Sequence, residues 1–227
     1  NLPIRTVGWY LKRWGFTPQK PVRRAYERSE PAVRKWLHET YPAIKQKARQ
    51  EGAEIHWGDE TGLRSDDVNG RGYAPKGQTP VRRAKGTPEK TNMISTVTNQ
   101  GKVRFMFYRE RLNAKMLIRF FRRLIRSVDR KVFLILDNLR VHHARVVKEW
   151  VAQHTDQIEL FYLPSYSPDL NPDEYLNCDL KAQVGQRPDS RRKGQLQQSS
   201  LQAMRSIQKQ PSRVQKYFQA KSICYAA

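Results

Sequence analysis

The chain has 227 residues, with 43 lysines and arginines against 21 aspartates and glutamates, which gives a formal net charge of +22. Such a surplus destabilises a compact fold by self-repulsion unless a polyanion neutralises it, so we expect nucleic acid as a partner. No apolar run approaches the roughly 20 residues that span a bilayer. Two cysteines cannot build a disulfide framework or a four-ligand zinc site, so we expect a cytoplasmic protein with no membrane role.

Residues 1–50 predict a partial DNA-binding region followed by a helical linker. Apolar residues recur at helical spacing from Ile4 to Trp14 and a glycine follows as a stop, which predicts a short basic helix. Two prolines within residues 16–24 forbid a helix interior and favour an extended, basic wing. Helix and wing are typical of the end of a winged helix-turn-helix, whose earlier helices we expect to be missing because the chain opens with Asn1. The alternative is a solvated basic helix packed on the main domain.

Basic side chains in this region and near the C-terminus are the candidate DNA contacts. Beyond Gln186 the chain carries nine lysines and arginines against Asp189 alone. Each phosphate that such residues neutralise releases counterions and adds affinity that depends on salt but not on sequence. The alternative is a solvated basic tail, and we expect residues 187–200 to be loop-like. The expected DNA-binding residues are Arg5, Lys12, Arg13, Lys20, Arg23, Arg24, Arg191, Arg192 and Lys193.

Residues 51–227 predict one α/β domain with basic C-terminal helices. Strands are expected at 54–57, 92–99, 103–108, 131–136 and 157–162, and helices at 113–128, at about 143–153 and from near 171. The strand at 131–136 is apolar throughout, which is typical of a strand buried on both faces. This order predicts a mixed sheet flanked by helices, the order of a ribonuclease H-like fold.

Two aspartates follow predicted strands. Asp59 comes after the first strand, and Asp137 ends the most apolar one. The carboxyl ends of neighbouring strands meet at one crevice, so we expect both carboxylates to lie close together and to face solvent. Hard divalent cations prefer such oxygen ligands, and a metal between the two acids would offset their repulsion.

Glu174 is the third candidate acid, and its sequence context allows two interpretations. Asn171 is a good N-cap, Pro172 occupies the favoured first helical position, and Glu174 falls at the capping-box spacing. Glu174 could therefore cap the helix. Alternatively Asn171 caps the helix alone, and Glu174 faces the crevice with the two aspartates. The spacing leaves both open.

Neighbouring polar residues favour structural roles. We expect Asp169 and Asp173 to shape the turn and the helix start. His142 and His143 follow Asp137 closely enough for one to approach a phosphate, but surface or capping histidines are more typical here.

Three sequence blocks resemble the mariner superfamily of DDE transposases, especially its bacterial insertion-sequence members. They are Trp-Gly-Asp-Glu at 57–60, Leu-Asp-Asn with a histidine shortly after at 136–143, and Leu-Pro-Ser-Tyr-Ser-Pro-Asp-Leu-Asn-Pro-Asp-Glu at 163–174. The resemblance implies that Asp59, Asp137 and Glu174 are the catalytic, metal-binding acids. It covers residues 53–227 well, and residues 4–30 resemble the last helix and wing of the family's DNA-binding region.

The resemblance further implies an activity. We expect hydrolysis of a phosphodiester bond at element ends with two Mg²⁺ or Mn²⁺ ions, followed by strand transfer into target DNA. It also implies double-stranded element-end and target DNA as partners, a homodimer on DNA and a nucleoid-associated bacterial protein. The alternatives are a ribonuclease H-like nuclease or resolvase without strand transfer, and a truncated DNA-binding remnant without activity.

Overall fold

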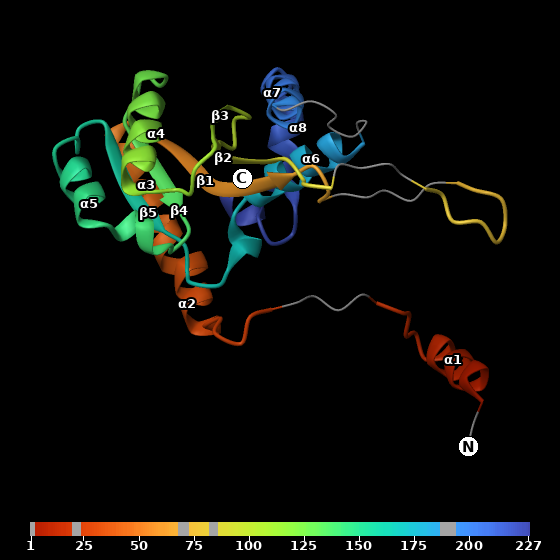
Figure 1. The fold of residues 1–227 in the computed structure, drawn as a ribbon. Coiled ribbons are helices and arrows are strands. Elements are labelled where there is room, and N and C mark those ends of the chain that lie inside the picture. The colour runs from red at the N-terminus through yellow and green to blue at the C-terminus, as the bar shows by residue number, and fades with distance from the viewer. Residues whose placement is uncertain (1–2, 20–23, 68–72, 82–85, 187–193) are drawn as a thin grey trace.

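The computed structural model describes residues 3–19, 24–67, 73–81, 86–186 and 194–227. Its centre is a five-stranded sheet in the order β3-β2-β1-β4-β5 (Figure 1). β1 pairs antiparallel with β2 and parallel with β4, so the predicted mixed sheet is confirmed. The strands are β1 (Glu54–Arg64), β2 (Lys90–Val97), β3 (Val103–Tyr108), β4 (Val132–Leu136) and β5 (Ile158–Tyr162).

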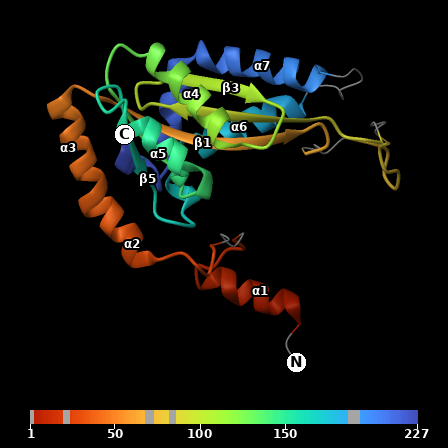
Figure 2. The same cartoon turned by 60° about the vertical axis from the view of Figure 1, so that its left-hand side comes forward.

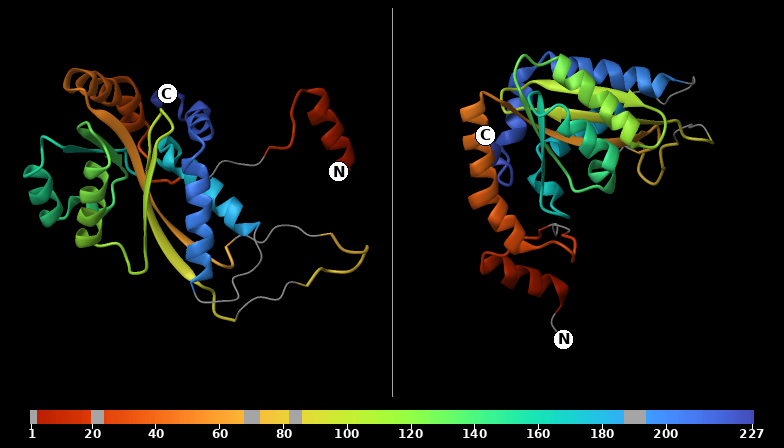
Figure 3. Two further views of the ribbon diagram at one scale, coloured as in Figure 1. Left: turned by 90° about the horizontal axis from the view of Figure 1, so that it is seen from above. Right: turned by 90° about the vertical axis from the view of Figure 1, so that its left-hand side faces the viewer.

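Helices cover both faces of the sheet, as predicted. Seen from above, α4 (Ala114–Arg126) and α5 (Arg145–Ala152) lie on one side, whereas α6 (Asp173–Gly185) and α7 (Gln195–Gln208) lie on the other (Figure 3). The short α8 (Pro211–Gln215) follows α7 on that second side. None of the described helices combines the length and apolar character that crossing a bilayer requires.

Side chains of β4 alternate between two hydrophobic cores. Val132, Leu134 and Leu136 pack under α4 and α5. Phe133 and Ile135 pack toward the core formed with α6 and α7. All five side chains are fully buried, and each contributes about 2 kcal/mol through removal of apolar surface from water. This burial explains the uninterrupted apolar sequence and fixes the strand that leads to Asp137.

β1 is longer than predicted. It pairs with β4 only as far as Trp57 and continues beside β2 to Arg64. Asp59 therefore lies inside β1, and the prediction that it follows the end of this strand is wrong. Because β4 ends where β1 continues, Asp59 still lies beyond the last β1 to β4 pairing, at the edge where the crevice was expected.

The linker is helical, as predicted, but it contains a π-helical turn. α2 (Glu30–Lys35) passes through this turn (Trp36–Thr40) into α3 (Tyr41–Glu51). Pro42 lacks an amide N–H, and in a regular helix its ring would clash with the backbone carbonyl one turn earlier. An irregular turn just before Pro42 is therefore expected. Buried aromatic rings of Trp36 and Tyr41 pack toward Trp57 and attach the linker to the sheet.

α1 (Ile4–Arg13) stands apart from the sheet and buries none of its residues (Figure 2). Its bounds agree with the predicted basic helix, and Gly15 follows at φ +81°, a conformation that favours glycine. At the other end of the chain, α7 begins at Gln195, so the expectation that residues up to 200 are loop-like is wrong for its last part. Residues 187–193 lie outside the described ranges.

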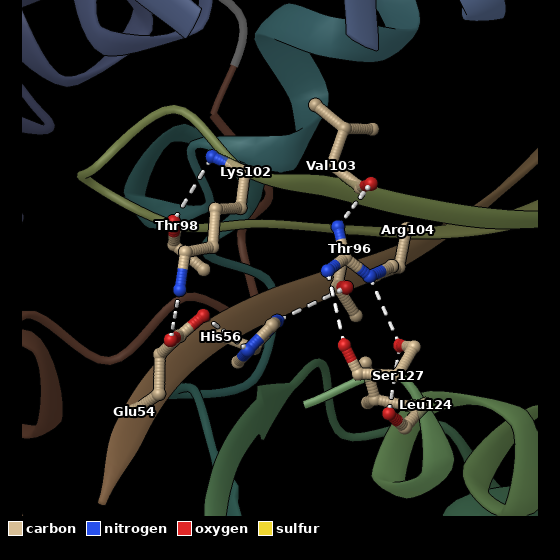
Figure 4. Close-up of polar contacts among 9 residues, drawn as sticks. All are labelled: Glu54, His56, Thr96, Thr98, Lys102, Val103, Arg104, Leu124 and Ser127. Atoms are coloured by element: carbon tan, nitrogen blue, oxygen red, sulfur yellow. Dashed lines mark hydrogen bonds and ion pairs between the residues drawn. The ribbon is translucent and has the colours of Figure 1, made fainter. Parts of the chain in front are cut away.

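A buried polar network anchors the start of β1. Glu54 Oε2 accepts a hydrogen bond from Lys102 Nζ at 2.5 Å, and Glu54 Oε1 lies 3.0 Å from His56 Nε2 (Figure 4). His56 Nδ1 lies 3.3 Å from Thr96 Oγ1, which connects β1 to β2. Burial favours the neutral acid, but the contacts with His56 and Lys102 outweigh it and lower the pKa of Glu54 to about 2.

Glu54→Gln is predicted to change how stability depends on pH. Because the folded state lowers this pKa, ionised Glu54 stabilises the fold fully above its ordinary pKa of 4.5, and that contribution is lost as the pH falls toward 2. Over this range the wild-type free energy of unfolding should fall by about 3 kcal/mol relative to the variant's. Urea titrations at several pH values measure the difference. Equal pH dependence in the two proteins would contradict the network.

Candidate active site

A cavity of about 400 Å³ opens where β4 and β5 end, beside the middle of β1. Asp59, Asp137 and Glu174 all line it. The register explains the first two, because Trp57 pairs with Ile135 and each aspartate follows two residues later on its own strand. Glu174 comes from the first turn of α6, whose start reaches the same edge. The structure thus brings the three predicted acids to one cavity from three elements.

Asp59 is held in place from α6. Asn177 Nδ2 donates a hydrogen bond to Asp59 Oδ2 at 2.9 Å. Burial, followed by the nearby carboxylates of Glu174 and Asp173, raises the pKa of Asp59 well above its usual range. Asp59 is therefore an acid whose ionised form is disfavoured unless a cation lies beside it.

Asp137 is held by a histidine that sequence reasoning assigned to the surface. His142 is fully buried, so that expectation is wrong. Its Nε2 lies 2.8 Å from Glu60 Oε1, and its Nδ1 lies 3.0 Å from the backbone oxygen and 3.2 Å from Oδ1 of Asp137. Burial opposes the charged ring, but contacts with Asp137 and Glu60 outweigh it and raise the pKa of His142 to about 10. The imidazolium therefore bridges two carboxylates and orients Asp137.

Glu60, Asp137 and His142 form a compact cluster of potential ligands. Their ligand atoms lie within 4.8 Å of one another, a spacing that could hold a metal ion. With the imidazole protonated the three groups form an ion-pair bridge, whereas a metal ion held by all three would require the neutral imidazole. The sequence signal for it was weak, because a histidine after a strand end is more typical of a surface position.

The start of α6 separates the two interpretations of Glu174. Asn171 Oδ1 accepts a hydrogen bond from the backbone N–H of Asp173 at 3.1 Å, so Asn171 supplies the cap. Among the described residues, the side chain of Glu174 makes no capping hydrogen bond, and it lines the cavity. Burial first, and then Asp137, raises the pKa of Glu174. This geometry favours the crevice-facing interpretation over the capping box.

Asp173 and Gly58 are the sequence neighbours of two of the acids, and both are closely packed. Asp173 is fully buried, and Ser95 Oγ donates a hydrogen bond to its Oδ2 at 2.7 Å. Asp173 therefore connects α6 to β2 in addition to its place at the start of the helix. A Cβ on Gly58 would lie 2.9 Å from Leu136 Cδ2 and 3.1 Å from the backbone oxygen of Ser95. β1 therefore needs glycine at the position just before Asp59.

The three acids fit a divalent cation. Within the described parts of the chain neither Asp59 nor Glu174 forms an ion pair, and Lys181 opposes the rise in the pKa of Glu174 without cancelling it. Burial, and after it the neighbouring carboxylates, raises the pKa values of both acids. All three offer oxygen ligands, which suit Mg²⁺ or Mn²⁺ better than zinc.

The predicted DNA-binding residues are distributed over both ends of the chain. Arg5, Lys12 and Arg13 are exposed on α1. The guanidinium of Arg13 lies 5.4 Å from the ring centre of Trp9. Arg24 is exposed and pairs with Glu30. Lys20, Arg23, Arg191, Arg192 and Lys193 lie outside the described residues.

Comparison with known proteins agrees with this geometry. The family model described as "DDE superfamily endonuclease" matches residues 54–197, and a winged helix-turn-helix model matches residues 1–40. A curated relative is the Transposable element Tc1 transposase of Caenorhabditis elegans, 28% identical over 202 residues, which cover 82% of this chain and 72% of the relative.

Solved structures of the Mos1 mariner transposase share the fold. The paired end complex with Mn superposes with a TM-score of 0.66 at 20% identity, covering 98% of this chain and 71% of that one. The catalytic domain of Mos1 superposes with a TM-score of 0.52 at 20% identity, covering 90% of this chain and 98% of that one. The predicted ribonuclease H-like fold is thereby confirmed. The family model described as "DDE superfamily endonuclease" matches more than half of this chain, so the chain belongs to the DDE superfamily endonucleases.

Proposed function

We propose that this chain is the catalytic region of a DNA transposase of the mariner and Tc1 type, and that it cuts element ends and joins them to target DNA. The convergence of Asp59, Asp137 and Glu174 in one cavity carries the proposal. The similarity to the Tc1 transposase and to the Mos1 strand transfer complex supports it. The specific block at 163–174 supports placement in the bacterial insertion-sequence branch, which makes a nucleoid-associated protein the expected setting.

The proposed division of labour follows the fold. Residues 1–50 are a partial winged helix-turn-helix and linker, and residues 51–227 are the catalytic domain. Asp59, Asp137 and Glu174 would hold two Mg²⁺ or Mn²⁺ ions. When bound, such ions act as Lewis acids on the scissile phosphate and activate the attacking oxygen. Asn177 fixes the orientation of Asp59, and the His142 bridge fixes Asp137, so the acids are positioned before DNA arrives.

Two steps would use this site. A water molecule first hydrolyses the phosphodiester bond at the element end and leaves a 3′ hydroxyl there. This hydroxyl then attacks a target phosphate in line, and the bond from that phosphorus to the target's 3′ oxygen breaks, so that a target 3′ hydroxyl is released. The Mos1 paired end complexes support a homodimer that holds two element ends. Incubation with element-end DNA and Mg²⁺ tests the proposal, because cleaved ends alone indicate a nuclease whereas joined products require strand transfer. Binding without either product would indicate a DNA-binding remnant.

DNA binding is predicted to depend steeply on salt. With 43 lysines and arginines available, affinity for mixed-sequence duplex should fall by at least about 100-fold between 50 and 200 mM salt. Replacing Arg5, Lys12 and Arg13 by alanine should reduce the slope of log affinity against log salt by about 1 for each lost phosphate contact. Fluorescence anisotropy measures this slope. An unchanged slope in the triple variant would remove α1 from the DNA interface.

A further inference from the structure

A second cavity adjoins the candidate active site. Its volume is about 850 Å³, and it lies between residues 24–28, which precede the helical linker, and the loop that leads into α6. Tyr166 and Pro168 line both cavities, so the two cavities adjoin at these residues. A cavity of this size suits a short, flexible segment of polymer or a small molecule better than a duplex.

Tyr166 stands between the two cavities in an unusual conformation. Its φ is +56°, and it is the sole non-glycine residue with positive φ in the described part of the chain. Its side chain is 59% exposed, so core packing does not explain why a tyrosine is kept there. Strained backbone positions of this kind cluster at functional sites, where the surrounding structure holds them. Tyr175, from the first turns of α6, adds a second partly exposed ring to the same cavity.

Cations lie beside these rings. Lys221 lines the cavity and forms no ion pair with the residues that the structure describes. The side chain of Arg24 is mostly exposed, and among the described residues it forms an ion pair with Glu30 alone. Arg28, by contrast, is buried and held by both Glu30 and Asp169, so it joins the linker to the loop at 163–174 and does not supply free charge.

Aromatic rings that share a cavity with exposed cationic side chains are a combination that binds unpaired nucleotides. Rings stack on the faces of bases, and cations neutralise the phosphates between them. Bases within a duplex are already stacked and cannot present these faces. We propose that the cavity between residues 24–28 and Tyr166 binds unpaired nucleotides next to the scissile phosphate. Tyr166 and Tyr175 are the stacking platforms, Lys221 is the main phosphate contact, and Arg24, which also pairs with Glu30, is a second contact. The inference rests on the proposed function only for the identification of these nucleotides as part of the DNA that is cut.

Binding of two DNA probes tests the cavity without cleavage. One probe is a blunt duplex, and the other is the same duplex with a short unpaired extension that contains 2-aminopurine, a base whose fluorescence is quenched by stacking. In EDTA, the wild-type chain should bind the extended probe about tenfold more tightly than the blunt one and should quench its fluorescence.

Substitutions assign the effect to the cavity. Tyr166→Gly removes the ring, and glycine adopts positive φ without strain, so the variant should fold while losing both the quenching and the preference. Tyr166→Trp should retain them. Lys221→Gln should lower the salt slope for the extended probe by about 1. Tyr26→Ala is the matched control, since this tyrosine is fully exposed and does not line the cavity.

The outcomes separate this inference from the proposed function. Equal binding of both probes by the wild-type chain, or full quenching by Tyr166→Gly, would overturn the cavity assignment. The same proteins are then given element-end DNA and Mg²⁺. Cleavage without any preference for the extension would leave the proposed function standing and the cavity assignment wrong. Preference and quenching without cleavage would support the cavity and count against the proposed function.

Discussion

Asp59→Asn is expected to abolish cleavage while making the metal-free protein more stable. The amide lacks the negative charge that binds a metal ion. Removing a residue that only supports a metal ligand lowers activity by up to about 100-fold, and the loss of cleavage activity here should be larger. Burial and the surrounding acids raise the pKa of Asp59 well above its usual range. Its ionisation therefore destabilises the fold as the pH rises above the unfolded pKa, and the neutral amide relieves that cost.

Two measurements check this prediction together. Cleavage of element-end DNA gives the catalytic loss, and thermal unfolding in EDTA gives the stability change at neutral pH. Asn177 can still donate to the oxygen of the substituted amide, so the local hydrogen bond survives. Glu149→Gln is a suitable control, because this acid is exposed on α5 and pairs with Arg145 at the surface. An Asp59→Asn protein that cleaves normally, or that unfolds at a much lower temperature, would contradict the assignment.

Chelation of divalent metal is expected to stop cleavage completely, and addition of metal is expected to raise the melting temperature. The three acids offer oxygen ligands and have too few cationic partners, so an ion that binds them relieves repulsion in the folded state. At a metal concentration about 100-fold above its Kd, the stabilisation is about 3 kcal/mol. Differential scanning fluorimetry with Mg²⁺ or Mn²⁺ measures this shift without DNA.

The same titration on Asp59→Asn supplies the comparison. This variant should show a smaller rise in melting temperature, because one ligand charge is gone. Cleavage that persists unchanged in metal-free buffer would show that the acids act by another chemistry. An equal metal-induced shift in both proteins would place the ions elsewhere.

Local sequence patterns were sufficient to predict the sheet and the position of its acids. The apolar run of β4 and the two strands expected at 92–99 and 103–108 depend on neighbours in sequence, and both match the structure. Asp137 was found because a buried strand must end before a charged residue. The length of β1 was not predictable in the same way, because its second half is specified by pairing with β2, a strand more than twenty residues later.

Tertiary contacts explain what sequence reasoning missed at the site. His142 is buried because Glu60, on β1, lies opposite it, a contact between residues far apart in the chain. From its sequence position Asp173 resembles an ordinary helix-start residue. Its buried hydrogen bond from Ser95 on β2, and its effect on the pKa of Asp59, depend on contacts between distant parts of the chain. The spacing of Asn171 and Glu174 allowed a capping box, and the orientation of α6 over β1 was needed to favour the cavity.

Strand transfer by Glu174→Gln tests the account most directly, since Glu174 is the acid with a credible structural alternative. Element ends that already carry a free 3′ hydroxyl are mixed with plasmid DNA and Mg²⁺, and joined products are measured for wild type and variant. The account predicts joining by wild type, a loss of orders of magnitude in Glu174→Gln, and unchanged DNA binding by the variant. Near-wild-type joining by Glu174→Gln would contradict it and would leave Asp173 or Asp169 as the third acid.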